Sequence, residues 1–177
     1  FMEGMNKSIN NGIIDLQFGN IIIEPRDGDT FIESAPAVMK KIRAIPGVDG
    51  VTRRYFLSGA FTKSTGNKMV TAYYIQGIDP DEEKTVTTLQ NWIFKGDFLE
   101  DGDSGKVILG THIAGGDKQR FMPQEDTLET TVGRKETLNF SNGIQREFDV
   151  KGIVDSRDLY AVMSAYISID DAEQILG

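Results

Sequence analysis

The sequence predicts an α+β protein that begins with a ferredoxin-like α/β layer and continues as a strand-rich segment. Hydrophobic periodicity and turn residues place a strand, a helix and two strands in succession, at residues 19–25, 34–46, 51–62 and 68–78. A second group of strand-like segments occupies residues 126–154, and a strand and a helix close the chain. The 177 residues are enough for one substantial domain or two small packed lobes.

The composition restricts the classes of partner and site. Hydrophobic residues make up 39% of the chain, enough for a core, and no apolar run approaches the roughly 18 residues that a bilayer-spanning helix requires. The formal charge is −8 and the basic residues are dispersed, so we do not expect nucleic acid as a partner. The absence of cysteine excludes disulfides and thiolate metal sites. Because the chain starts at Phe1 and stops at Gly177, directly after a predicted helix, we expect a fragment of a longer protein.

The first residues are apolar at about helical spacing, at Phe1, Met2, Met5, Ile9 and Ile13. An amphipathic helix packed on the domain and the outer end of a transmembrane helix both fit this pattern. The missing start methionine favours the second interpretation.

The first predicted strand, residues 19–25, carries three consecutive isoleucines between a glycine and a proline, and should be buried on both faces. In the helix that follows, Ser34 is the expected cap, because Pro36 then falls in the first turn. Thr30 with Glu33 is a competing capping box that would leave the proline deeper inside. The predicted buried stripe consists of Ala35, Val38, Met39, Ile42 and Ile45.

Residues 51–62 and 68–78 predict two strands joined by a polar hairpin loop at 63–67. Phe56 and Phe61 fit either a partner surface or the core. Asp79 then caps a short helix that has Pro80 at its first position. The acids that follow meet the positive end of the helix dipole, and a threonine-rich stretch limits the helix to short pieces.

The middle of the chain predicts a local core from Trp92, Ile93, Phe94, Phe98 and Leu99. Strands are expected at residues 127–132, 136–140 and 145–154, with Asn142-Gly143 as the turn of the last pair. A two-residue loop would place Leu138 opposite Glu147. We favour a longer loop or a bulge that brings Leu138 opposite Phe148.

The chain closes with a predicted strand over residues 159–169 and a helix capped by Asp170, with Glu173 three positions on. The expected inner face of this helix consists of Ala172, Ile175 and Leu176.

No pattern of catalytic, cofactor-binding or metal-binding residues is found, so the sequence predicts that the chain is not an enzyme and has no cofactor. His112 is the single histidine, and a solvated or capping role is favoured over catalysis. Glu100-Asp101-Gly102-Asp103 lacks the further ligands of a calcium loop and predicts a turn. Gly115-Gly116 lacks the surroundings of a phosphate-binding loop. A hydrolase that uses Asp79, Glu82 and Glu83 remains an alternative hypothesis.

Short motifs follow one another in a fixed order over about two thirds of the chain. They are the segment 1–14, Gly19-Asn20-Ile21-Ile22-Ile23-Glu24-Pro25, Pro46-Gly47-Val48, Ile78-Asp79-Pro80, Gly96-Asp97-Phe98-Leu99, Val107-Ile108-Leu109-Gly110 with Ala114, residues 148–154 and residues 160–176. Their order resembles the soluble MacB-like periplasmic core domain of FtsX/LolC/LolE-type ABC transporter permeases. Residues 115–123 depart from the family pattern.

This resemblance implies a porter-like α/β lobe at residues 1–79 and 157–177, with an inserted β-rich, Sabre-like lobe that carries short helices at residues 80–156. It implies a domain on the extracytoplasmic side of the cell membrane, held by flanking transmembrane helices, with both chain ends close together on one face. A separate cytoplasmic ATPase subunit or domain would drive export or extraction of a lipoprotein, lipid, peptide or drug, in a homodimer or permease heterodimer. The alternative is an extracytoplasmic ligand-sensing or partner-binding module with no transport role.

Overall fold

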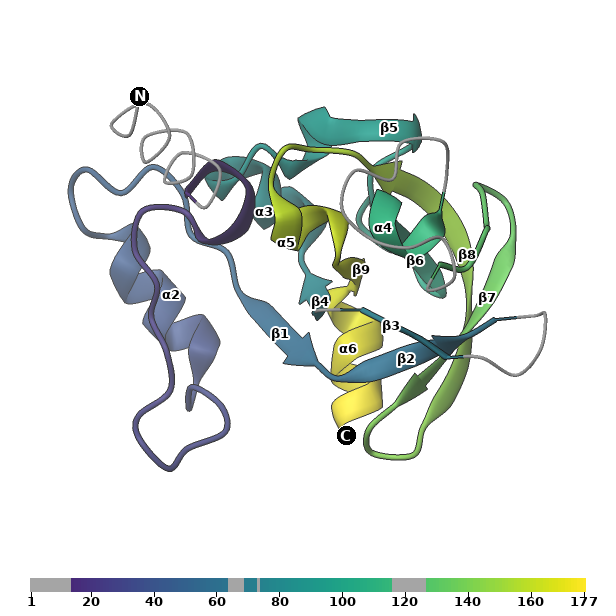
Figure 1. Cartoon of the computed structure of the whole chain (residues 1–177). Coiled ribbons are helices and arrows are strands. Elements are labelled where there is room, and N and C mark those ends of the chain that lie inside the picture. Colours follow the sequence, from purple (N-terminus) through teal and green to yellow (C-terminus); the bar gives the residue numbers. More distant parts are fainter. Residues whose placement is uncertain (1–13, 64–68, 73, 116–126) are drawn as a thin grey trace, which may run out of the picture.

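The computed structural model describes residues 14–63, 69–72, 74–115 and 127–177 (Figure 1). The predicted helix at residues 1–13, most of the hairpin loop and most of the departing segment 115–123 lie outside the described residues. The helices are η1 (Ile14–Phe18), α2 (Ala35–Arg43), α3 (Pro80–Val86), η2 (Leu89–Trp92), α4 (Thr111–Ala114), α5 (Leu159–Val162) and α6 (Ile169–Leu176). The strands are β1 (Arg54–Leu57), β2 (Gly59–Thr62), β3 (Met69–Thr71), β4 (Ile75–Ile78), β5 (Ile93–Gly96), β6 (Lys106–Gly110), β7 (Lys135–Phe140), β8 (Gln145–Val154) and β9 (Ala165–Ser168).

The described strands form one mixed sheet in the order β1-β4-β9-β6-β8-β7-β2-β3, with β5 paired to β8 beside this path. The pairs β4–β9 and β6–β8 are parallel, and the others are antiparallel. The α+β class predicted from the sequence is therefore confirmed. Strands of both predicted lobes lie in this one sheet, and the division into two lobes stays a prediction.

The sheet buries apolar side chains on both of its faces. On one face, Ile75, Val107, Ala165 and Ile167 pack with Ala172 and Ile175 of α6, and this core continues under β2, β7 and β8. On the other face, a smaller core under η2 consists of Ile78, Leu89, Leu99, Ile108, Val154 and Tyr166. The central strands reflect this arrangement: every residue of β4 and β9, and all but the first residue of β6, is buried.

The predicted hairpin is confirmed, but each of its two strands is divided. Strand β1 pairs with β4, and after Ser58 strand β2 pairs with β3. The division follows from a second pairing: β2 also pairs with β7, so β2 and β3 lie at the opposite end of the strand order from β1 and β4. Phe61 is fully buried, whereas Phe56 is half exposed and stacks edge-on against Tyr74.

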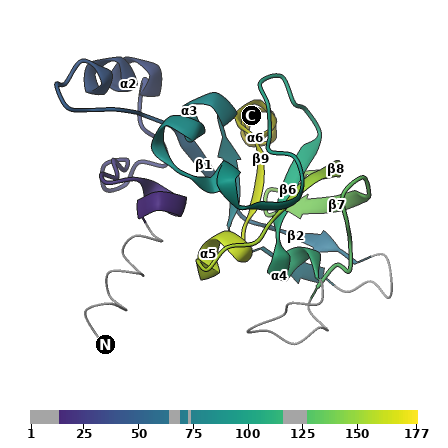
Figure 2. The same ribbon diagram turned by 90° about the horizontal axis from the view of Figure 1, so that it is seen from above.

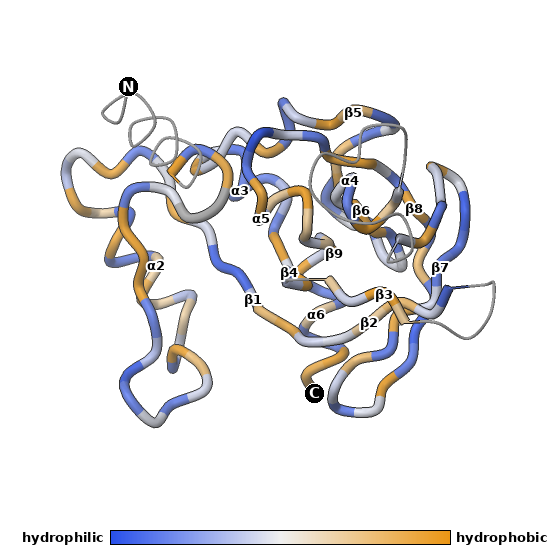
Figure 3. Tube along the Cα trace, viewed as in Figure 1, coloured by the Kyte–Doolittle hydropathy of each residue, from blue (hydrophilic) through white to orange (hydrophobic). Residues whose placement is uncertain are grey.

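The predicted buried strand at residues 19–25 is wrong. This segment has no regular structure, and Ile21, Ile22 and Ile23 are 80%, 56% and 50% exposed. It runs beside α2 on an arm that projects from the sheet in both views (Figures 1 and 2). Figure 3 shows that this apolar stretch lies away from the strands. The three isoleucines have high β propensity, but among the described residues no strand of the sheet pairs with this segment.

The helix α2 begins after Ser34 as predicted, but the cap and the stripe differ from the prediction. Ser34 has a left-handed backbone (φ 54°) and its side chain makes no capping hydrogen bond. In the predicted stripe only Met39 is buried, and Ile45 is 54% exposed. The reason is that α2 stands on the projecting arm, where no sheet face lies opposite the stripe (Figure 1).

Residues 127–132 do not form the predicted strand. The backbone amides of Leu128 and Thr130 donate to the carbonyls of Ile113 and Ala114 at the end of α4. Glu129 between them has a positive φ of 57°, which breaks any strand geometry. The predicted local core is also only partly formed. Leu99 is fully buried, but Trp92, just before the short strand β5, is 37% exposed, and Phe94 on β5 is 50% exposed.

The predicted strand at 159–169 is divided into α5 and β9, because Asp158 accepts a hydrogen bond from the Ala161 amide and caps a helical turn. The cap of α6 is Ser168 and not Asp170: the Ser168 hydroxyl accepts from the Asp171 amide, at 3.2 Å. This shift moves Asp171 into the interior. Ala172 and Ile175 are buried as predicted, whereas Leu176 is 37% exposed.

The β7–β8 hairpin turns at Asn142-Gly143 as predicted, but neither of the two predicted registers is found. Leu138 lies opposite Arg146, and Glu136 lies opposite Phe148. The turn is longer than two residues, since the Phe140 amide donates to the Ile144 carbonyl. Leu138 and Phe148 still share one face and are both fully buried.

The close contact between β4 and α6 generates a stability prediction. A Cβ on Gly77 would overlap the Cβ of Ala172, so Gly77→Ala should lower the free energy of unfolding by about 1–3 kcal/mol through overpacking. Urea unfolding measures the loss. Adding Ala172→Gly should recover part of it, even though glycine in a helix itself costs about 1 kcal/mol. A double variant no more stable than Gly77→Ala would contradict this packing.

Candidate functional site

The predicted acidic helix start contains a buried ion pair. Glu83 of α3 is fully buried and pairs with Arg54 of β1, whose Nε donates to Glu83 Oε2 at 3.0 Å and whose Nη2 donates to Oε1. The Thr87 hydroxyl donates to the same carboxylate at 2.6 Å. Arg54 Nη1 also donates to Gln76 Oε1 at 2.9 Å. Each charge is thus surrounded by partners, as burial of an ion pair requires.

The remaining acids of this helix have separate roles. Asp79 caps α3 as predicted, since its Oδ1 accepts from the backbone amides of Asp81 and Glu82 at 3.1 and 3.0 Å. Glu82 pairs with Arg43 of α2. Asp79, Glu82 and Glu83 are therefore not brought together as a carboxylate pair, and the geometry does not support the hydrolase hypothesis.

His112 lies in α4, at the predicted helix start, and is half-buried. Burial lowers the pKa of its imidazole, while the nearby carboxylate of Asp155 acts in the opposite direction. The imidazole is therefore neutral at pH 7. Among the described residues, no group of three or more histidine and acidic side chains is placed to hold a metal ion.

The acidic segment 100–103 is a turn as predicted. Asp103 Oδ2 accepts from the Glu100 amide at 2.9 Å, and Lys151 Nζ donates to Asp103 and Glu100 at 2.6 and 3.1 Å. Burial alone would raise the pKa of Asp103, but the hydrogen bonds from Lys151 and from the Glu100 amide hold it below its usual value. These carboxylates are thus paired with a lysine.

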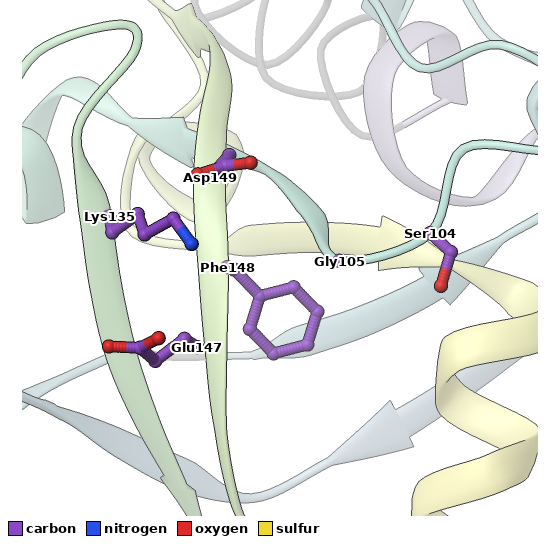
Figure 4. Close-up of a pocket in the computed structure, with 6 residues that line it drawn as sticks. All are labelled: Ser104, Gly105, Lys135, Glu147, Phe148 and Asp149. Carbon is purple, nitrogen blue, oxygen red and sulfur yellow. The ribbon is translucent and has the colours of Figure 1, made fainter.

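Two adjoining hollows lie beside this turn, along the strands β7 and β8. The first encloses about 190 Å³ and is lined by Ser104, Gly105, Lys135, Glu147, Phe148 and Asp149 (Figure 4). The second encloses about 410 Å³ and shares Asp149, which pairs with Lys106 at 2.9 Å. Both are open and their charged residues are solvent-exposed or paired with one another. This lining identifies no ligand.

The Arg54–Glu83 pair generates a mutational prediction. Glu83→Gln should lower the free energy of unfolding by about 3–5 kcal/mol, because it leaves the Arg54 guanidinium buried without its counter-charge. Glu82→Gln on the same helix is the matched control, because its partner Arg43 is half exposed, and it should cost less than about 1 kcal/mol. Denaturant unfolding measures both. Equal losses would contradict the assignment.

The environment of His112 generates a pH prediction. Its pKa in the folded chain lies below the ordinary value of 6.5, so the unfolded chain binds a proton first as the pH falls. The free energy of unfolding should therefore decrease as the pH is lowered through about 6.5, and should be unaffected by His112 at higher pH. His112→Gln should remove this part of the pH dependence, and no other histidine contributes. Parallel stability curves for the two proteins between pH 7.5 and 5 would contradict it.

Comparison with known proteins gives matches at the level of structure. No family model and no curated protein sequence matches the chain. The extracellular domain of the noncanonic ABC-type transporter YknZ from Gram-positive bacteria superimposes with a TM-score of 0.53 and 14% identity, over 78% of this chain and 64% of that chain. The periplasmic region of MacB from Actinobacillus actinomycetemcomitans gives a TM-score of 0.53 and 17% identity, over 80% of this chain and 58% of that chain.

The chain therefore spans about three fifths of the length of these two structures. No helix among the described residues has the length and apolar character that a bilayer crossing requires. The resemblance inferred from the ordered motifs is confirmed at the level of the fold. The chain has the fold of the extracytoplasmic domains of the ABC-type transporter YknZ and of MacB.

Proposed function

We propose that this chain is the extracytoplasmic domain of an ABC transporter permease, and that it transmits ATP-driven motion to the export or extraction of cargo. The fold shared with the YknZ extracellular domain over 78% of the chain is the observation that carries the proposal. The cargo class follows from the motif resemblance alone and comprises lipoproteins, lipids, peptides and drugs.

The interior of the domain is suited to transmitting motion. A domain that passes on a displacement has to move as a rigid body, and the chain is tied internally by buried charges such as the Arg54–Glu83 pair. The described residues bring together no catalytic constellation, so in this proposal ATP hydrolysis belongs to a separate cytoplasmic subunit or domain. The partners are that ATPase, a second permease copy or a related permease, and the membrane through flanking helices.

The positions of the two chain ends bear on this mechanism. The proposal expects both ends on one face, but η1 and the last residue of α6 lie on different sides of the molecule (Figures 1 and 2). The described residues therefore do not support this expectation. Residues 1–13, which lie outside the described residues, would decide where the amino-terminal end emerges.

The alternative, a ligand-sensing module, expects a concave apolar pocket. The hollows described above are open, and most of the side chains that line them are charged. They give this alternative no specific support.

The location of the domain is testable by accessibility labelling. The chain has no cysteine, and Asp101 is exposed in the turn before β6, so Asp101→Cys introduces a single reactive thiol into this domain. In the full-length protein, with any cysteine outside this segment replaced, a membrane-impermeant maleimide should label this thiol from the outer side of the cytoplasmic membrane. Leu138→Cys, at a fully buried position, is the control that should not react.

Labelling that requires permeabilisation of the cytoplasmic membrane would overturn the proposal. External labelling together with failure of the full-length protein to co-purify with an ATPase would favour the sensing module.

A further inference from the structure

The helix α6 carries a fully buried carboxylate at Asp171. Asp171 Oδ1 accepts from the Ser104 hydroxyl at 2.9 Å and lies 2.7 Å from Arg146 Nη2, and Oδ2 accepts from the Gly105 amide at 2.7 Å. Ser104 and Gly105 precede β6, and Arg146 belongs to β8. One side chain thus joins the last helix to two segments that lie 67 and 25 positions earlier in the chain.

The other polar side-chain contacts between α6 and the rest of the chain are exposed or only partly buried. Glu173 pairs with Arg53 at 2.9 Å and accepts from the Tyr55 hydroxyl at 3.3 Å. Gln174 accepts from Arg146, and the Asn142 side chain donates to the Ile175 carbonyl. Exposed ion pairs contribute little to stability, whereas a buried carboxylate with no partner is strongly unfavourable. Asp171 is therefore the polar contact that dominates the attachment of α6.

The geometry also determines which strands the attachment reaches. The Gly105 amide lies one residue before β6, and β6 and β8 are parallel neighbours, with Lys106 paired to Asp149. Arg146 lies near the start of β8 and its guanidinium stacks over Phe148, 5.6 Å from the ring centre. A displacement of α6 thus acts on the starts of both strands. The apolar contact of Ala172 with Gly77 ties the same helix turn to β4.

We propose that Asp171 is the joint that couples α6 to strands β6 and β8, so that the helix and these strands move as one body. Without this carboxylate, α6 would separate from the loop before β6 while its apolar contacts with β1 and β4 remain. The use of this joint to carry transport motion rests on the proposed function, but the coupling itself does not.

Hydrogen exchange on the 177-residue chain tests the joint. Asp171→Asn should accelerate exchange of the Gly105 amide and of α6 by about a hundredfold, because the substitution removes the charge that Arg146 neutralises. Glu173→Gln is the matched control: it removes an acid with an arginine partner from the same helix, at an exposed position, and should leave the Gly105 amide unchanged. Equal exchange of the Gly105 amide in the two variants would overturn the proposal.

A second variant keeps the test decisive if Asp171→Asn does not fold. Ser104→Ala removes the hydroxyl that donates to Asp171 and accepts from Arg146 Nη2 at 3.3 Å, but it leaves the charge of Asp171 paired with Arg146. The chain should therefore fold and show a smaller acceleration, about tenfold, at the Gly105 amide. No acceleration there would contradict the joint.

Spin labels give an independent measure of the coupling, because the chain has no cysteine of its own. Labels at Leu176→Cys on α6 and Lys135→Cys on β7 should give a narrow distance distribution in the otherwise unchanged chain and with Glu173→Gln. The distribution should broaden with Asp171→Asn or, to a smaller extent, with Ser104→Ala. Unchanged widths would contradict the joint, even if the labelling of Asp101→Cys supports the proposed function. Conversely, if that labelling placed the domain on the cytoplasmic side, a broadened distribution with Asp171→Asn would still support the joint.

Discussion

The sheet depends on the placement of β9, a strand of four buried residues near the end of the chain. It pairs in parallel with β4 on one edge and antiparallel with β6 on the other. Strands β1 and β4 are thereby joined to β6, β7 and β8, which lie between them and β9 in sequence. Because β9 contributes side chains to both cores, its insertion completes both faces at once: Ala165 and Ile167 on one face, Tyr166 on the other.

The parts of the fold that the sequence predicted well are those determined by local chemistry. Asp79 and Pro80 start a helix together: the Asp79 side chain accepts from two amides of the first turn, and Pro80 lacks the N–H that would have no partner at the first position. Asn142-Gly143 produces a turn between two strands, because glycine accepts a positive φ (88° here) at little cost. The order of motifs likewise led to the correct fold.

The parts that failed depend on distant partners. Residues 19–25 have the composition of a strand, yet no described strand of the sheet pairs with them, and the parallel neighbour of β4 is residues 165–168. Residues 127–130 bond to the end of α4 instead of a strand, and no local pattern indicates this. The burial of Asp171 had a signal that was missed: Ser168 followed three positions later by an acid is a capping pattern, and it fixes the helix two residues earlier than the Asp170 cap. The burial of Glu83 had none, because its partner is supplied by β1.

The chain carries a net negative charge, but the fold pairs several of its acidic side chains with basic ones. Three acids are neutralised by bases from distant segments: Glu83 by Arg54, Asp171 by Arg146, and Asp103 by Lys151. These pairs connect strands with helices and turns. The three carboxylates therefore act as structural ties, and none of them supplies a group placed for bond making or breaking.

Among the described residues, the main path of the sheet ends at β1 and β3, strands of four and three residues. A foreign strand that docks on either would gain few hydrogen bonds. Such short borders discourage polymerisation through open sheet edges. Short edge strands thus disfavour the strand-to-strand association between copies of the chain that leads to fibrils.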